Sequence, residues 1–215
     1  MTKLSADDIK EIMRRFQEQN PEPECELVWK NPYTLLVATV LSAQATDKSV
    51  NLATAPLFAE YDTAEKMLSL GIDGLIPYIR PIGLYNAKAK NIIALSKMLV
   101  ADFGGVVPRS REELMRLPGV GRKTANVVMN VAFGEKTMPV DTHVFRVSRL
   151  IGLSDGESVE EVEAELLACI PDEYLLHAHH WLLLHGRYVC KARKSDCAHC
   201  LISDVCAAYM RKSAQ

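Results

Sequence analysis

Helix-start and helix-stop signals recur along the whole chain, and they limit its fold more than any other feature of the sequence. Near the N-terminus, Ser5-Ala6-Asp7-Asp8 can cap a helix whose apolar residues follow the i, i+3, i+4, i+7 spacing, and Asn20-Pro21 would end it. Asn31-Pro32 is a typical N-cap and first-turn pair, and the segment that follows, 33–41, has little polar face. We expect that helix to be central and buried. Alternation typical of a half-buried strand is hard to find, so the sequence predicts an all-α fold.

Further helices are expected between similar boundary signals. Ser110 and Ser158 each begin a capping box, and Pro171 closes the helix that follows Ser158. Gly104-Gly105 would end the longest helix. The remaining segments expected to be helical are 47–59, 63–69, 73–80, 86–103, 122–133 and 142–150.

Composition indicates a folded protein without a membrane segment. The chain has 215 residues, of which 48% are hydrophobic, enough for one large core or two small ones. No apolar run approaches the roughly 18 residues of a membrane-spanning helix. The first residues, 1–8, lack the basic start and apolar run of a secretory signal. We therefore expect a cytosolic, unprocessed protein.

Charge is unevenly distributed along the chain. The net charge of -2 argues against nucleic-acid binding if it is applied to the whole molecule. Residues 155–173, however, hold eight Asp or Glu and no Lys or Arg, whereas residues 180–215 hold six Lys or Arg against two Asp. Phosphates respond to potential within a Debye length of roughly 8–10 Å, so a basic face can coexist with an acidic one.

Four cysteines lie close together near the C-terminus. Cys190, Cys197, Cys200 and Cys206 form a C-x6-C-x2-C-x5-C pattern, while Cys25 and Cys169 stand apart. In a cytosolic chain, clustered thiols favour metal ligation over disulfides, and this spacing leaves both zinc and an iron–sulfur cluster open.

The loop between the first two of these cysteines carries Lys191, Arg193 and Lys194. It is either a solvated loop or a set of cations that a metal holds against DNA phosphates. The nearby histidines lack the i, i+4 spacing of helical zinc ligands and are expected to be core or surface residues; they are His177, His179, His180 and His185.

The segment 117–125, Leu-Pro-Gly-Val-Gly-Arg-Lys-Thr-Ala, is expected to join two short helices. Its two glycines allow positive φ and close approach of a ligand to the backbone. The second helix would begin near Arg122 and point its unpaired amides at a phosphate beside the turn. An ordinary turn between two helices is equally compatible with the glycine pair.

Lys123 is expected at the start of that second helix, where the helix dipole disfavours a cation and so favours the neutral, nucleophilic amine. Asp141 follows 18 residues later and is a preferred N-cap residue for the next helix. It is therefore either a cap alone or a cap that also stabilises a cationic sugar and helps to move a proton.

Taken together, these residues resemble the endonuclease III family of helix-hairpin-helix DNA glycosylases. The resemblance rests on Leu117 through Val127, on the Pro139-Val140-Asp141-Thr142-His143 segment and on the four-cysteine spacing, and it spans essentially the whole chain. It implies two helical domains with a cleft between them. A six-helix domain over 25–135 would carry the hairpin, and 1–24 with 136–215 would form a cluster domain.

The resemblance also implies roles for single residues. Lys123 would be the Schiff-base nucleophile and Asp141 the catalytic carboxylate. One [4Fe-4S] cluster, mainly structural, would be bound by Cys190, Cys197, Cys200 and Cys206. Gln44 and Leu84 would fill the gap left by an everted nucleotide, although both could be ordinary loop or packing residues. DNA contacts would come from Gly119, Val120, Gly121, Arg122, His143, Lys191, Arg193 and Lys194.

The activity implied by this resemblance is excision of oxidised pyrimidines from duplex DNA, followed by cleavage 3′ to the abasic site by β-elimination. The expected partner is double-stranded DNA with oxidised pyrimidines or abasic sites, and we expect a monomer that acts in the cytoplasm. Three alternatives stay open: a monofunctional adenine mismatch glycosylase, which Lys123 disfavours, a non-enzymatic helix-hairpin-helix DNA-binding protein, and an electron-transfer iron–sulfur protein.

Overall fold

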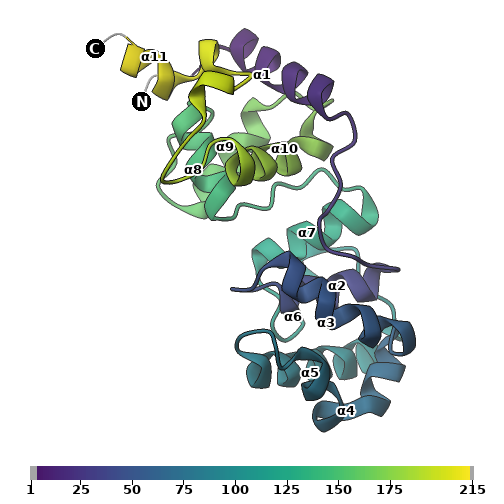
Figure 1. Cartoon of the computed structure of the whole chain (residues 1–215). Helices are drawn as coiled ribbons and strands as arrows, with labels where there is room; N and C mark the ends of the chain where they lie inside the picture. The colour runs from purple at the N-terminus through teal and green to yellow at the C-terminus, as the bar shows by residue number, and fades with distance from the viewer. Residues whose placement is uncertain (1–3, 214–215) are drawn as a thin grey trace. The chain divides into compact units, whose positions relative to one another are not determined.

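The computed structural model describes residues 4–213, and its regular elements within that range are all helical, which confirms the all-α prediction (Figure 1). The expectation about the chain start falls partly on residues 1–3, which lie outside the described range. The helices are α1 (Ala6–Gln19), α2 (Pro32–Leu41), α3 (Asp47–Glu60), α4 (Ala64–Ile79), α5 (Tyr85–Phe103), α6 (Arg111–Arg116), α7 (Arg122–Phe133), α8 (Thr142–Ile151), α9 (Val159–Cys169), α10 (Leu175–Tyr188) and α11 (Ala207–Ser213), with short 3-10 turns at Cys197–His199 and Ser203–Val205.

The described chain divides into two compact units. One unit is residues 25–135 and contains α2 to α7; the other combines residues 4–24 with 136–213 and contains α1 and α8 to α11. Each unit has its own apolar core. Among the described helices, none has the length and apolar character needed to cross a bilayer.

Helix α2 is the buried centre of the 25–135 unit, as its sequence predicts. Every residue from Tyr33 to Leu41 is buried. Asn31 caps the helix, because its side chain accepts the Thr34 N–H at 2.9 Å while the Thr34 hydroxyl accepts the Asn31 N–H at 3.0 Å. The Tyr33 hydroxyl meets the Ser96 hydroxyl of α5 at 2.7 Å, so a buried hydrogen bond joins the two helices.

Helix α4 contains a break where the sequence predicts two separate helices. Gly71 has φ 67° and ψ 179°, which is not helical, and the helix changes direction there. The predicted segments 63–69 and 73–80 correspond to the two halves. A glycine serves here because residues with a side chain rarely adopt this backbone conformation.

In the other unit, an ion pair ties α1 to the C-terminal segment. Arg15 donates to both carboxylate oxygens of Asp204, at 2.6 and 3.0 Å, and to the Leu201 carbonyl at 2.8 Å. Figure 1 shows the purple α1 lying beside the yellow C-terminal segment. These bonds hold the stretch that carries Cys200 and Cys206 against the first helix.

Helix α10 is the long helix that the sequence analysis did not anticipate. Its N-cap residue, Tyr174, makes no side-chain cap bond, and apolar residues and histidines occupy most of its faces. His179, His180 and His185 are buried in it, so of the two places expected for these histidines, core or surface, these three lie in the core.

Candidate functional site

The hairpin between α6 and α7 uses its two glycines in different ways. Gly119 has φ 80°, and a Cβ there would lie 2.9 Å from Asn91 Nδ2 and 3.0 Å from Asn91 Cβ. Gly121 is the N-cap of α7 in an extended conformation with φ -93°, and nothing lies within 4 Å of its Cβ position. The sequence allows positive φ at both glycines, but only Gly119 adopts it. The exposed Gly121 leaves room for a ligand to approach the backbone.

The start of α7 is suited to an anion. Gly121 provides no side-chain cap, so the first amides of the helix lack the partner that a Ser or Asp cap would supply. Val120 is buried and donates its N–H to the Leu117 carbonyl at 3.1 Å, which fixes the turn. Unpaired amides at the positive end of a helix dipole bind phosphate readily.

Lys123 is the second residue of α7 and is half-buried. Within residues 4–213 its amine takes part in no hydrogen bond or ion pair. A lysine near a helix start gains nothing from the dipole, which favours cations at the other end. Its amine is therefore available to react.

Asp141 caps α8, as predicted, and does so with one oxygen. Its Oδ1 accepts the N–H groups of His143 and Val144, both at 2.9 Å. The other oxygen accepts no hydrogen bond from the residues described. One carboxylate can thus fix a helix start and keep a second oxygen for chemistry. Asp141 belongs to the 136–213 part of the chain and Lys123 to the 25–135 unit.

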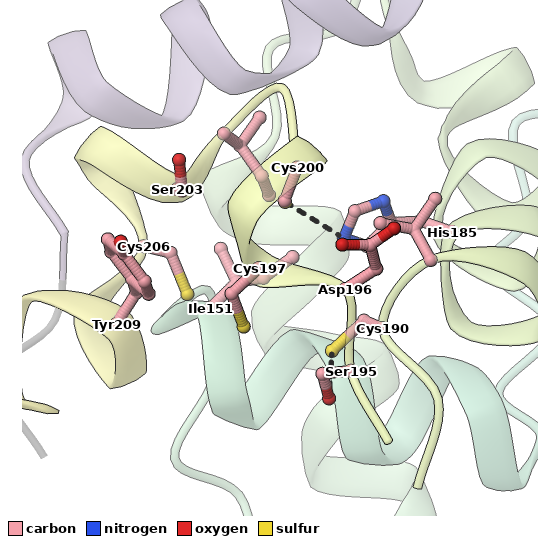
Figure 2. Close-up of a pocket in the computed structure, with 12 residues that line it drawn as sticks. Ile151, His185, Cys190, Ser195, Asp196, Cys197, Cys200, Ser203, Cys206 and Tyr209 are labelled. Carbon is pink, nitrogen blue, oxygen red and sulfur yellow. Dashed lines mark hydrogen bonds between the residues drawn. The ribbon is translucent and has the colours of Figure 1, made fainter.

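The four clustered cysteines line a single pocket, together with His185 and Ile151 (Figure 2). All four are half-buried, and none forms a disulfide. Cys200 Sγ lies 3.8 Å from His185 Nε2, Cys190 Sγ lies 4.0 Å from the Ser195 hydroxyl, and Cys206 Sγ lies 3.9 Å from the Leu150 carbonyl. As they stand, no three His, Cys, Asp or Glu side chains of the described residues are grouped closely enough to hold a metal ion. The four thiols nonetheless surround one space.

Burial controls the protonation of this pocket. It raises the pKa of the Cys190 and Cys200 thiols and lowers that of His185 to about 4. His185 is therefore neutral near pH 7, and it packs edge-on against the Phe16 ring. Because metals bind thiolates, metal coordination here would release the thiol protons.

The basic loop between Cys190 and Cys197 is exposed throughout. A hydrogen bond from the Asp196 N–H to the Val189 carbonyl, 3.1 Å long, closes the loop. Lys191, Arg193 and Lys194 therefore lie on the surface of a closed loop beside the cysteine pocket.

Sequence reasoning missed two side chains at this pocket. Arg146 of α8 donates to the carbonyls of Gly186 and Cys190, at 2.9 and 2.7 Å, and so ties α8 to the first cysteine. His185 lies against Cys200. Both contacts depend on tertiary packing, and no local pattern in the sequence indicates them. His143, expected to contact DNA, is half-buried, and its Nδ1 has no hydrogen-bond partner in the described part of the chain.

Gln44 and Leu84 share an unusual backbone conformation. With φ of 55° and 60°, they are the only residues other than glycine with positive φ among residues 4–213. Both are exposed, and Leu84 keeps 61% of its surface open to solvent. Such strain costs about 1–3 kcal/mol per residue and is concentrated at functional sites. The two residues expected to act as wedges are thus the two that are strained.

Comparison with known proteins agrees with this arrangement. The family model for "HhH-GPD superfamily base excision DNA repair protein" matches residues 37–172. The chain is 59% identical to Endonuclease III of Rickettsia felis, over 96% of this chain and 97% of that protein. It also resembles a solved structure described as a trapped endonuclease III-DNA covalent intermediate, with a TM-score of 0.90, 44% identity and coverage of 98% and 99% of the two chains. A non-covalent Endonuclease III-DNA complex gives a TM-score of 0.91 at 43% identity and covers 99% and 100%.

The fold and these matches place the chain in the helix-hairpin-helix class of base excision DNA repair proteins. Within that class, the chain belongs to the endonuclease III family.

The two hairpin glycines predict different effects of alanine. Gly119→Ala should lower the free energy of unfolding by about 1–3 kcal/mol, since Ala is strained at this φ and meets Asn91. Gly121→Ala should cost no more than about 1 kcal/mol but should weaken binding to duplex DNA, because its methyl group occupies the approach to the α7 amides. Denaturant unfolding and fluorescence anisotropy measure the two effects. Equal DNA binding by Gly121→Ala and the native chain would contradict the phosphate role of this turn.

Proposed function

We propose that this chain excises oxidised pyrimidines from duplex DNA and cuts the strand 3′ to the abasic site through a Schiff base on Lys123. As a member of the endonuclease III family it is a base excision repair enzyme, a DNA glycosylase and abasic-site lyase that acts on double-stranded DNA. The observation that carries the residue assignment is the half-buried amine of Lys123, which has no partner among the described residues and lies at the start of α7, where no side chain caps the helix.

The chemistry follows from the use of an amine in place of water. The neutral Lys123 Nζ attacks C1′ of the damaged nucleotide, and the C1′–N bond breaks as the base leaves with the bonding electrons and takes up a proton. Opening of the sugar ring gives a protonated imine, which acidifies the C2′ hydrogen. Loss of that proton expels the 3′ phosphate and breaks the strand. The family relative described as a trapped covalent intermediate with DNA supports a covalent route.

Asp141 supplies the charge that this pathway requires. Departure of the base places positive charge on the sugar, and the Asp141 oxygen that does not serve the α8 cap can stabilise that charge and help to move a proton. The cap bonds to His143 and Val144 hold the carboxylate in one orientation. Neither base release nor strand cleavage needs a nucleotide cofactor.

The proposed DNA contacts fall into two groups. Backbone groups of the hairpin, from Gly119 to Arg122, would bind phosphate, and His143 with the basic loop would add further contacts from the other unit. Gln44 and Leu84 would enter the duplex beside the everted nucleotide. Their strained backbone supports this role, because the strain positions exposed side chains that do little for packing.

The four-cysteine pocket is proposed to hold one [4Fe-4S] cluster. Four thiols and an apolar lining that includes Ile151 and Ile202 suit a thiolate-bound cluster. When bound, the cluster would act as a structural support that fixes the basic loop. Zinc also accepts four thiolates, so metal content decides between the two.

The expected substrates are oxidised pyrimidines in general. We expect the protein to act as a monomer in the cytoplasm, associated with the nucleoid if its source is bacterial.

Borohydride reduction tests the Schiff base. With duplex DNA that contains an abasic site, the native chain should form a stable covalent adduct, and Lys123→Ala should form none, because the amine is lost. Lys97→Ala removes an exposed lysine from α5 and serves as the control that keeps the adduct. A persistent adduct in Lys123→Ala, or none in the native chain, would contradict the proposal.

Two substitutions separate the roles of Asp141. Asn is as good an N-cap as Asp, so Asp141→Asn should unfold like the native chain yet release an oxidised pyrimidine about 100-fold more slowly or worse. Asp141→Ala should also lose about 1 kcal/mol of stability, because the cap is removed. Single-turnover base release and denaturant unfolding measure these effects. Native excision rates in Asp141→Asn would show that Asp141 is a cap alone.

Metal content tests the cysteine site. The purified chain should contain about four iron atoms and absorb broadly in the visible range. Cys197→Ser should lower the iron content, whereas Cys169→Ser, which lies outside the pocket, should not. One zinc ion per chain and no iron would contradict the cluster and show that the four cysteines form a zinc site.

A further inference from the structure

Lys88, the fourth residue of α5, is a buried lysine that the proposed mechanism does not use. Only 5% of its surface is exposed, and its Nζ has no hydrogen-bond partner anywhere in residues 4–213. Burial of a polar group without a partner is costly, and burial of an ammonium is more so. Burial accordingly lowers the pKa of Lys88. A lysine held in this way requires an explanation beyond packing.

The position of Lys88 directs its side chain toward the start of α5. It lies on the core-facing side of the helix, in line with Ile92, Leu95 and Leu99. Side chains in a helix lean toward its N-terminus, so the Lys88 side chain covers the turn that begins at Leu84. That turn has no side-chain cap, since the N-cap residue is Leu84 in the left-handed conformation. Uncapped amides and an unpartnered amine therefore share the first turn of α5.

The same part of α5 lies against the hairpin. Asn91, three residues after Lys88 and thus on a neighbouring helix position, packs at the Cα of Gly119. The first turns of α5 and the phosphate-binding turn before α7 therefore belong to one region of the 25–135 unit. A strand of DNA bound at the hairpin would have further phosphates within reach of α5.

Local charge in this region favours a phosphate. Residues 74–101 contain no Asp or Glu but hold four cations, Arg80, Lys88, Lys90 and Lys97, in a chain whose net charge is -2. Lys90 and Lys97 are exposed, and the acidic residue of α5, Asp102, lies in the last turn, so the start of the helix carries positive surface charge. Such a patch attracts the DNA backbone over roughly 8–10 Å.

We propose that the first turn of α5, with Lys88, binds a DNA backbone phosphate at a site separate from the hairpin and so positions the strand beside Leu84. The inference rests on the proposed function, which supplies DNA as the ligand. The flexible lysine stem lets the amine move from its buried position to the phosphate, which provides the partner that residues 4–213 do not. Lys88 is thus a positioning residue and takes no part in bond breaking.

Methionine at this position separates a ligand role from a structural one. Met has nearly the same shape and no charge, so a lysine kept only for packing could be replaced without loss. We expect Lys88→Met to be at least as stable as the native chain in denaturant unfolding. We also expect it to bind a duplex with an uncleavable abasic-site analogue about five- to tenfold more weakly. The slope of log K against log salt should fall by about one, which corresponds to one lost phosphate contact.

Lys10→Gln is the matched control, because it removes an equal charge from an exposed position of α1, which is not part of the 25–135 unit. It should leave the salt slope close to that of the native chain. Replacing single phosphates near the analogue with neutral methylphosphonates then locates the contact. At one position the replacement should weaken the native chain but have no effect on Lys88→Met.

An unchanged salt slope in Lys88→Met, or the absence of such a position, would overturn the inference. The native chain must form the borohydride adduct in the same preparation. If it does and Lys88→Met binds DNA like the native chain, only the Lys88 site is wrong. If the native chain neither forms the adduct nor binds the duplex, the proposed function itself fails.

Discussion

The backbone N–H groups at the start of every helix need partners, and this requirement organises the molecule. Side chains of Ser5, Asn31, Thr46, Thr63, Ser110, Asp141 and Ser158 satisfy it at seven helix starts. At α10, turn bonds such as His177 N–H to the Tyr174 carbonyl take over. The starts of α5 and α7 have no side-chain cap, and these are the two places proposed to bind DNA phosphates. In this proposal, the helix starts without a side-chain cap are the ones that receive the ligand.

Asp141 serves the fold as a helix cap and, in the proposed mechanism, also serves the reaction. Its cap bonds use only Oδ1, so the carboxylate is held rigidly while its second oxygen stays available. The surroundings of Lys123 are different, because its amine has no partner among residues 4–213 and lies at a helix end that does not favour cations. The two side chains differ in charge and in hydrogen-bond partners, and these differences suit a stabilising carboxylate and a nucleophilic amine.

Much of this architecture is predictable from local sequence because caps and glycine stops are short-range signals. The segments after Ser5, Asn31 and Ser158 begin where their caps indicate, and the break in α4 falls at Gly71 between two predicted helices. Helix α10 was missed because it lacks a side-chain cap and a clear polar face. Lys88, Arg146 and His185 could not be recognised, since burial and carbonyl partners distant in sequence define them. The extended backbone of Gly121 likewise depends on how the turn enters α7.

The central claim is that the Lys123 amine forms the covalent bond to DNA, and peptide mapping of the reduced complex tests it most directly. The native chain would be trapped with borohydride on abasic duplex DNA, digested, and analysed by mass spectrometry for the peptide that carries the reduced sugar. The modification should lie on Lys123 alone. Its presence on another amine, such as Lys88 or the N-terminus, would contradict the account.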